Sequence, residues 1–208
     1  YKKGDTTVTS PASSETTFTY RGKTKAYDNG IPQIFINSSR DTKTKDINLY
    51  TDTTKTKVNA SLMIKGADGS TTEVSNSGTI NVRGNSTSRA DKKAYNLKFD
   101  SSINPFGMGS AKKWSLLANI FDKTLIRNHM GLDFQRYLES TQTPFANNVS
   151  KAFTSNCKNV DLYVDGKYLG TYLLTESVEV GADRVNIDTS YYDKTTDDVK
   201  ADSTPTTV

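Results

Sequence analysis

The chain has 208 residues, of which 34% are hydrophobic, and its mean hydropathy is −0.63. This length suits one large domain or two small ones, and the low hydrophobic content predicts that polar segments outside a core make up part of it. The net charge of +4 comes from basic residues that alternate with acidic ones, and no apolar run approaches the roughly 20 residues of a membrane helix, so we expect an anionic ligand, no nucleic-acid partner and no membrane span.

Residues 1–30 are rich in Thr, Ser, Lys and Gly, a composition typical of a linker that cannot bury enough surface to fold alone. At most, they contribute an edge strand at 17–20. The folded domain is predicted to begin near Gly30, with a first β-strand at 31–37. Alternating apolar and polar residues then predict an antiparallel meander, with strands at 46–51, 57–65 and 71–74.

The stretch 79–100 contains two strand-like runs around a short loop that is rich in basic and hydroxyl residues. Gly84, Asn85 and Ser86 in this loop tolerate a positive φ and leave their backbone N–H groups unhindered, so the turn is suited to hold a phosphate. From spacing alone an ordinary hairpin turn is favoured, because short glycine motifs often occur by chance.

The second of these runs, at 94–99, alternates between two faces. Tyr95, Leu97 and Phe99 share one face, while Asn96 and Lys98 share the other. If the two strands pair, Lys98 is predicted to point toward the polar side of the loop.

The best helix candidate runs from residue 123 to 139, after Asp122 as a plausible N-cap. Apolar side chains recur there at four-residue spacing, and a stripe of this kind is expected to pack on a sheet. Its members are Ile126, Met130, Phe134 and Leu138.

Asp165-Gly166 lies between two alternating apolar runs, at 160–164 and 167–175. Asp-Gly in this position is the strongest short-range signal for a β-hairpin. After residue 187 the apolar content collapses, and 188–208 is interpreted as a low-complexity tail or a truncated continuation.

Cysteine and histidine each occur once, as Cys157 and His129. With only these two nitrogen or sulfur ligands, we expect no intrachain disulfide and no structural zinc site, and we expect any metal to be held by oxygen atoms. His129 is interpreted as a partly buried structural residue and Cys157 as incidental, because no motif places a catalytic partner beside them.

Three blocks in sequence order resemble the CotH (spore coat protein H) kinase family, and the resemblance spans 31–187. The blocks are INVRGNSTS with KKAYNLKFD, FGMGSAKKWSLLANIFDKTLIRNHMGLDF, and VDLYVDGKYLGTYLLTESVEVGADRVNI. The run of blocks is more specific than any one short motif. It implies an α+β fold: the antiparallel-sheet-rich N-terminal lobe of an atypical protein kinase, with one main packed helix at about 123–139, truncated before the catalytic lobe.

The resemblance also implies a nucleotide site. The segment 83–86 would stand for a glycine-rich loop, and Lys98 for the strand lysine that pairs with phosphates. The helix start would lie nearby, and 174–178 would be the hinge-like connection whose backbone meets an adenine. The implied nucleotide-binding residues are Arg83, Gly84, Asn85, Ser86, Lys98, Asp122, Arg127 and Glu176.

The implied cofactor is ATP with Mg²⁺ or Mn²⁺, and the implied acceptor is a Ser/Thr-rich surface or coat protein at an extracellular, cell-surface or spore-surface location. Family members carry a catalytic acidic residue and a metal-binding aspartate in a DFD-like motif after a tryptophan. The only tryptophan here is Trp114, and the motif is absent. We therefore assign no catalytic residue and no metal ligand, and expect this chain alone to be inactive as a kinase.

Other functions stay open from the residues. The first is a non-catalytic extracellular adhesion or scaffold module with the same fold, in a cell-surface multi-enzyme assembly. A carbohydrate-binding β module would need exposed aromatic residues on one sheet face, for which the candidates are Tyr163, Tyr168 and Tyr172. A glycosidase would need a carboxylate pair, for which the candidates are Asp161, Asp165, Glu176 and Glu179.

Overall fold

A computed structural model describes residues 30–141, 154–180 and 185, together with the backbone of four short strands outside these ranges. Among the short strands, β1 (Thr6–Thr9) pairs with β2 (Thr17–Tyr20), and β11 (Tyr192–Asp193) pairs with β12 (Asp198–Val199). The edge strand expected at 17–20 is β2, whereas β1 was not predicted. The linker at 1–30 and the tail at 188–208 stay predictions.

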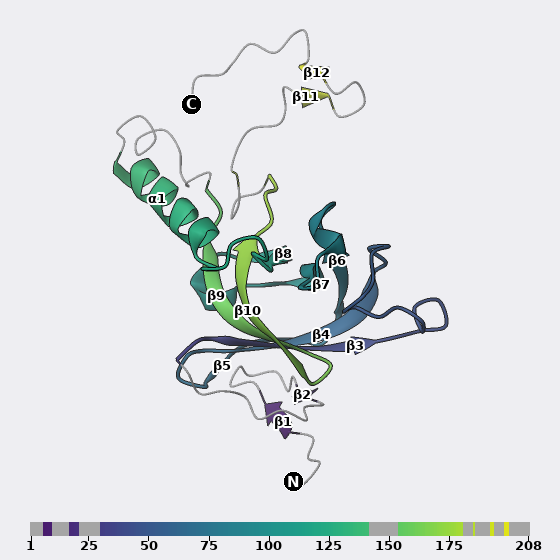
Figure 1. Cartoon of the computed structure of the whole chain (residues 1–208). Coiled ribbons are helices and arrows are strands. Elements are labelled where there is room, and N and C mark those ends of the chain that lie inside the picture. The colour runs from purple at the N-terminus through teal and green to yellow at the C-terminus, as the bar shows by residue number, and fades with distance from the viewer. Residues whose placement is uncertain are drawn as a thin grey trace.

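The domain is built on one eight-stranded, mostly antiparallel sheet (Figure 1). In spatial order its strands are β3 (Gln33–Ser39), β9 (Cys157–Val164), β10 (Lys167–Glu176), β8 (Ala111–Leu117), β7 (Ala94–Ile103), β6 (Gly78–Arg83), β4 (Val58–Lys65) and β5 (Thr71–Ser75).

The sheet closes on itself because β3 pairs with β4 as well as with β9. The edge of β4 opposite β3 is shared by two strands. The start of β4 pairs with β6, and the end of β4 pairs with β5. The pairing of β3 with β9 is parallel. Two short 3₁₀ helices, η1 (Thr87–Arg89) and η2 (Pro105–Gly107), flank β7. With the helix α1 (Arg127–Thr141), this architecture confirms the α+β class.

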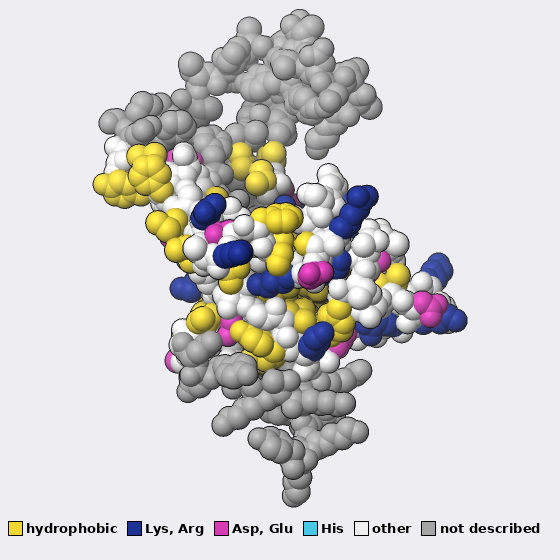
Figure 2. Space-filling view, viewed as in Figure 1, with side chains coloured by type: hydrophobic (Ala, Val, Ile, Leu, Met, Phe, Trp, Pro, Cys, Tyr) yellow, Lys and Arg dark blue, Asp and Glu magenta, His cyan; other side chains and the backbone are white. Residues whose placement is uncertain are grey.

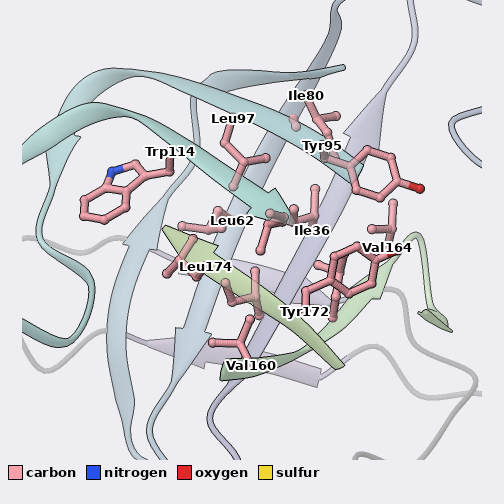
Figure 3. Close-up of a cluster of buried hydrophobic side chains, with 14 of the residues drawn as sticks. Ile36, Leu62, Ile80, Tyr95, Leu97, Trp114, Val160, Val164, Tyr172 and Leu174 are labelled. Carbon is pink, nitrogen blue, oxygen red and sulfur yellow. The ribbon is translucent and has the colours of Figure 1, made fainter. Parts of the chain in front are cut away.

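The hydrophobic core fills the inside of the closed sheet (Figure 3). Strand alternation explains this, since every second side chain of each strand points inward. Tyr95, Leu97 and Phe99 of β7, which were predicted to share one face, are all buried, and Trp114 of β8 is the largest fully buried side chain. A second, smaller cluster contains Phe35, Met63 and Tyr163.

The predicted hairpin around Asp165-Gly166 is confirmed. Asp165 and Gly166 have φ angles of 47° and 79°, which is the left-handed pair that a tight two-residue hairpin turn requires. The strand predicted at 46–51 is wrong, because this segment forms turns. Asn48 in this segment accepts the backbone N–H of Tyr50, and Asp52 just after it accepts that of Thr54. Such local bonds compete with strand pairing.

The predicted helix is confirmed in type but wrong in its start. Helix α1 begins at Arg127, four residues later than expected. Leu125 has a φ of 61° and interrupts the helical path. Asp122 still acts at the helix start, because its carboxylate accepts the backbone N–H of Arg127 at 2.9 Å.

The prediction that this helix packs its apolar stripe on the sheet is also wrong. None of the residues of α1 is buried, and the exposed fractions of Met130 and Phe134 are 63% and 62%. Figure 1 shows α1 projecting away from the sheet beside β9, and Figure 2 shows hydrophobic side chains gathered on its exposed side. No helix of the described residues is long and apolar enough to span a membrane.

Helix α1 contacts the rest of the domain through polar residues instead. The carboxylate of Glu139 accepts the Thr154 hydroxyl at 2.6 Å and the Thr154 N–H at 3.3 Å, and Arg136 donates to the Thr154 carbonyl at 3.5 Å. His129, Arg136 and Glu139 lie on one helix face. The hydrogen-bonding side of α1 therefore faces β9, and its apolar stripe faces away.

Asp122 gives the first testable prediction. Its pKa is lowered chiefly by the hydrogen bond from the Thr124 hydroxyl, and further by the Arg127 N–H. A carboxylate whose pKa is lower in the folded state than in the unfolded state stabilises the fold at pH values above its unfolded-state pKa. This stabilisation is lost as the pH falls through the folded-state pKa. We expect Asp122→Ala to lower helix content and thermal stability at pH 7, measured by circular dichroism. The deficit relative to the wild type should shrink below about pH 4, and an equal deficit at pH 3 would contradict this assignment.

Candidate functional site

A cleft of about 720 Å³ lies on the outer, polar face of the sheet, where the first turns of α1 approach β7, β8 and the end of β10. A smaller cavity of about 340 Å³ adjoins it along 117–122. The two share Arg83, Leu117, Arg127 and Asn128. A volume of this size suits a small-molecule ligand, since ligand pockets usually measure about 300 to 1,000 Å³.

Two arginines supply the positive charge of the cleft. Arg83 is the last residue of β6, where it pairs with Ala94 of β7, and its side chain is exposed. Arg127 is the first residue of α1 and its side chain is 81% exposed, with its Nε atom 3.5 Å from the Asp122 carboxylate. Among the described residues, Arg83 has no ion-pair partner. Guanidinium groups of this kind bind phosphates with paired hydrogen bonds.

The floor of the cleft is made by polar side chains from three neighbouring strands. Asn96 of β7 pairs with Ser115 of β8, which pairs with Thr175 of β10. Directly paired residues point to the same face of a sheet, and the Ser115 hydroxyl lies 3.2 Å from the Asn96 side-chain oxygen. These three residues offer hydroxyl and amide groups to a ligand.

Glu176 lines the cleft at the end of β10, with Ser177 and Val178 next to it. Its side chain is 7% exposed. Asn156 holds this carboxylate by donating from its backbone N–H at 2.9 Å and from its side-chain amide at 3.1 Å. The carboxylate is therefore fixed in position. Glu176 pairs with the core residue Trp114, so its side chain starts on the opposite face of the sheet from Ser115 and Thr175.

The loop after β6 is held by its own contacts. Gly84 has a φ of 97°, and a Cβ atom there would overlap the Thr87 side chain. Lys93 is 7% exposed and donates from Nζ to the Ser88 carbonyl at 2.8 Å, and the Tyr172 hydroxyl donates to the Lys93 carbonyl at 2.8 Å. This loop, which follows Arg83, is thus attached to the core.

The cleft and the adjoining smaller cavity together contain four of the eight residues implied by the sequence. Arg83 and Arg127 line both cavities, Glu176 lines the larger and Asp122 the smaller. The loop residues at 84–86 line neither, although Thr87 lines the smaller cavity.

Lys98 also lines neither cavity. It is exposed and pairs with Thr79 of β6 and Lys113 of β8. Lys98 lies two residues after Asn96 on β7. The two side chains therefore share a face of the sheet and start about 7 Å apart. Its predicted role in phosphate binding stays a prediction.

Ser115 and Asn128 were not predicted as site residues, and Thr175 was predicted only as part of the hinge-like segment 174–178. The available signal was the polar Ser115 between the apolar Trp114 and Leu116, which marks an outward-facing position in a strand. Which strands lie beside each other could not be read from this signal, so the shared floor was not predicted.

The residues considered for other functions lie in separate surroundings. Asp161 is fully buried and accepts hydroxyls from Tyr168 and Thr171, whereas Asp165 accepts the N–H and hydroxyl of Ser38. Glu179 forms an ion pair with Lys113. Of the three tyrosines, Tyr163 and Tyr172 are buried, and the ring of Tyr168 packs against that of Tyr163 at a tilt of 38°, so they do not form an exposed aromatic platform.

The single cysteine lies beside α1. Cys157 is half-buried, and desolvation by burial, with the nearby Asp133 charge, raises the pKa of its thiol to about 11. At neutral pH it is therefore a thiol, not a thiolate nucleophile. His129 is partly buried, as expected, but it has a partner that no motif indicated: its Nε2 atom is 3.2 Å from the Asp133 carboxylate.

Comparison with known proteins gives one positive result. The family model described as CotH kinase protein matches residues 80–206, which is more than half of the chain. The match begins within β6 and extends beyond 187, where the resemblance seen in the sequence ended. No curated protein matches the chain.

Proposed function

Because this chain belongs to the CotH kinase protein family, we propose that its outer-face cleft binds ATP and that the chain is the nucleotide-binding part of a CotH-like kinase. One observation carries the proposal: Arg83, Arg127 and Glu176, which come from three separate segments, line the same cleft. The family match supports a kinase-related function, and the cleft supports a location for the nucleotide.

In this proposal the phosphates lie at the arginine side of the cleft. Arg83 ends a strand and Arg127 starts a helix, so both cations are held at fixed ends of regular elements. The N-terminus of α1 adds backbone N–H dipoles that favour an anion. The adenine base of ATP would then lie toward residues 176–178, where the segment at the end of β10 offers backbone hydrogen-bond donors and acceptors.

The residues present fit the nucleotide better than they fit its metal ion. Asp122 and Glu176 are the described carboxylates that line the cavities, and each already accepts hydrogen bonds on both oxygens. Mg²⁺ usually takes one or two carboxylates together with substrate phosphates and water. Both carboxylates are therefore already engaged within the chain, and we assign neither of them to the ion.

The wider activity is part of the same proposal. The complete protein would transfer phosphate from ATP to Ser or Thr hydroxyls of a surface or coat protein, outside the cell or on a cell or spore surface. This chain alone would bind nucleotide without transferring phosphate, because the acidic residues that orient the acceptor and the metal in the family are not recognisable in it.

The test is calorimetric titration of the chain with ATP and Mg²⁺. Arg83→Ala should weaken ATP binding about ten- to hundredfold, because a hydrogen bond to a charged group contributes about 1.5–3 kcal/mol. Lys98→Ala, measured alongside, decides whether that lysine also contributes.

The matched control is Arg89→Ala, which removes another exposed arginine that lines neither cavity. ATP binding should not change in this variant. Equal affinities of the wild type and Arg83→Ala would overturn the proposed site.

The second candidate is the non-catalytic adhesion or scaffold module. The apolar side of α1 favours it, because Met130 and Phe134 of the helix and Ile126 just before it are exposed, and exposed apolar patches often mark interaction surfaces. The same titration separates the two functions, since a pure scaffold would bind no ATP with Mg²⁺.

A further inference from the structure

A cluster of three different metal-ligand side chains lies where α1 meets β9, outside the cleft. The ligand atoms of His129, Asp133 and Cys157 all lie within 4.8 Å of one another. His129 and Asp133 are one turn apart on α1, with Nε2 and the carboxylate oxygen separated by 3.2 Å, and Cys157 is the first residue of β9.

We propose that His129, Asp133 and Cys157 bind one zinc ion that links α1 to β9, with water in a fourth position. The donor set supports zinc, which takes thiolate, imidazole and carboxylate ligands in a tetrahedral arrangement. Neighbouring ligand atoms of such a site lie about 3.5 Å apart, as the bond lengths of about 2.0–2.3 Å require. The His129 and Asp133 ligand atoms already lie 3.2 Å apart, and the other distances, which are at most 4.8 Å, would shorten on binding.

The surroundings favour a bound cation. The charged groups that act on Cys157 are the carboxylates of Asp133 and Glu176 and the guanidinium of Arg136, so negative charge exceeds positive charge around the thiol. Ion access is open from solvent, because the side chains of His129 and Asp133 are 26% and 62% exposed.

The two elements that carry the ligands are already joined nearby. Glu139, farther along α1, accepts two hydrogen bonds from Thr154, three residues before Cys157. Closing the cluster around an ion therefore costs little additional ordering of the chain. The expectation that no zinc site forms counted only nitrogen and sulfur ligands, and it did not foresee that Asp133 completes a set with His129 and Cys157.

Zinc at this position would hold the wall of the cleft, because Asn128, Gly131 and Leu132 of α1 line it. The ion would thus fix the first turns of α1 relative to the sheet. Zinc binding does not depend on nucleotide binding, so the zinc site can be tested whether or not the cleft binds ATP.

The test uses Co²⁺ as a spectroscopic substitute for zinc on the full 208-residue chain under reducing conditions. We expect one Co²⁺ per chain and a thiolate-to-cobalt charge-transfer absorption that added Zn²⁺ removes. Because the chain has a single cysteine, this absorption can come only from Cys157. Absence of the absorption at saturating Co²⁺ overturns the proposal.

Variants identify the other ligands. Cys157→Ser should abolish the absorption, and His129→Gln and Asp133→Asn should each weaken Zn²⁺ binding at least tenfold. Asp46→Asn is the control, since it removes an exposed carboxylate elsewhere and should leave binding unchanged. Unchanged zinc affinity in His129→Gln overturns the three-ligand site.

A second measurement uses only the wild-type chain, so its result does not depend on whether the variants fold. In the wild-type chain, Zn²⁺ should slow alkylation of Cys157 at least tenfold and raise the midpoint of thermal unfolding. An alkylation rate that Zn²⁺ does not change overturns the proposal without reliance on any variant.

Discussion

Replacement of Trp114 by alanine should lower the free energy of unfolding by about 3–5 kcal/mol, the cost usually seen when a large core aromatic is removed. Trp114 is fully buried inside the closed sheet, and its indole N–H donates to the Ala111 carbonyl at 3.0 Å. The substitution leaves a cavity and also removes this hydrogen bond. Chemical unfolding followed by far-ultraviolet circular dichroism measures the effect.

The matched control is Phe134→Ala, which removes another aromatic ring from an exposed position on α1. Its effect should lie within about 0.5 kcal/mol, as for most surface substitutions. Comparable losses in the two variants would mean that the apolar side of α1 is buried in solution, and would contradict the placement of this helix.

Replacement of Gly84 by alanine should destabilise the chain by about 1–3 kcal/mol and weaken ATP binding at the proposed site. The φ of 97° is unfavourable for any residue with a Cβ atom, and the added methyl group would also overlap Thr87. Relief of this overlap must move the loop next to Arg83. Thermal unfolding and ATP titration of the same sample measure the two effects.

Gly69→Ala separates conformational strain from overlap. Gly69 also has a positive φ, of 79°, but no atom lies within 4 Å of a Cβ placed there. We expect it to lose some stability and to bind ATP as the wild type does. If Gly84→Ala retained full ATP affinity, the loop after Arg83 would have no part in positioning this arginine.

Most of the sheet could be predicted from the sequence, because strand alternation is a local property. The strands expected at 57–65 and 94–99 correspond to β4 and β7, and the Asp165-Gly166 hairpin is present. The segment 46–51 alternates in the same way but forms turns, since Asn48 and Asp52 satisfy backbone donors locally. Alternation alone does not distinguish these outcomes.

The site could be predicted only in part. Arg83 and Arg127 follow from the sequence and the family resemblance, and both line the cleft. Ser115 and Thr175 reach it because β8 pairs with β7 on one side and with β10 on the other. This order of strands joins residues 60 positions apart, and no local pattern encodes it.

The sequence by itself determined which side chains each strand turns inward, where the tight turns lie and which family the chain resembles. Only the tertiary structure decided the closure of the sheet through β3 and β4, the orientation of α1, and the meeting of His129 with Cys157. The physical reason is the range of the interactions. Period-two burial and glycine turns act within a few residues, whereas helix orientation depends on which distant side chains, here those at Thr154, satisfy its polar face.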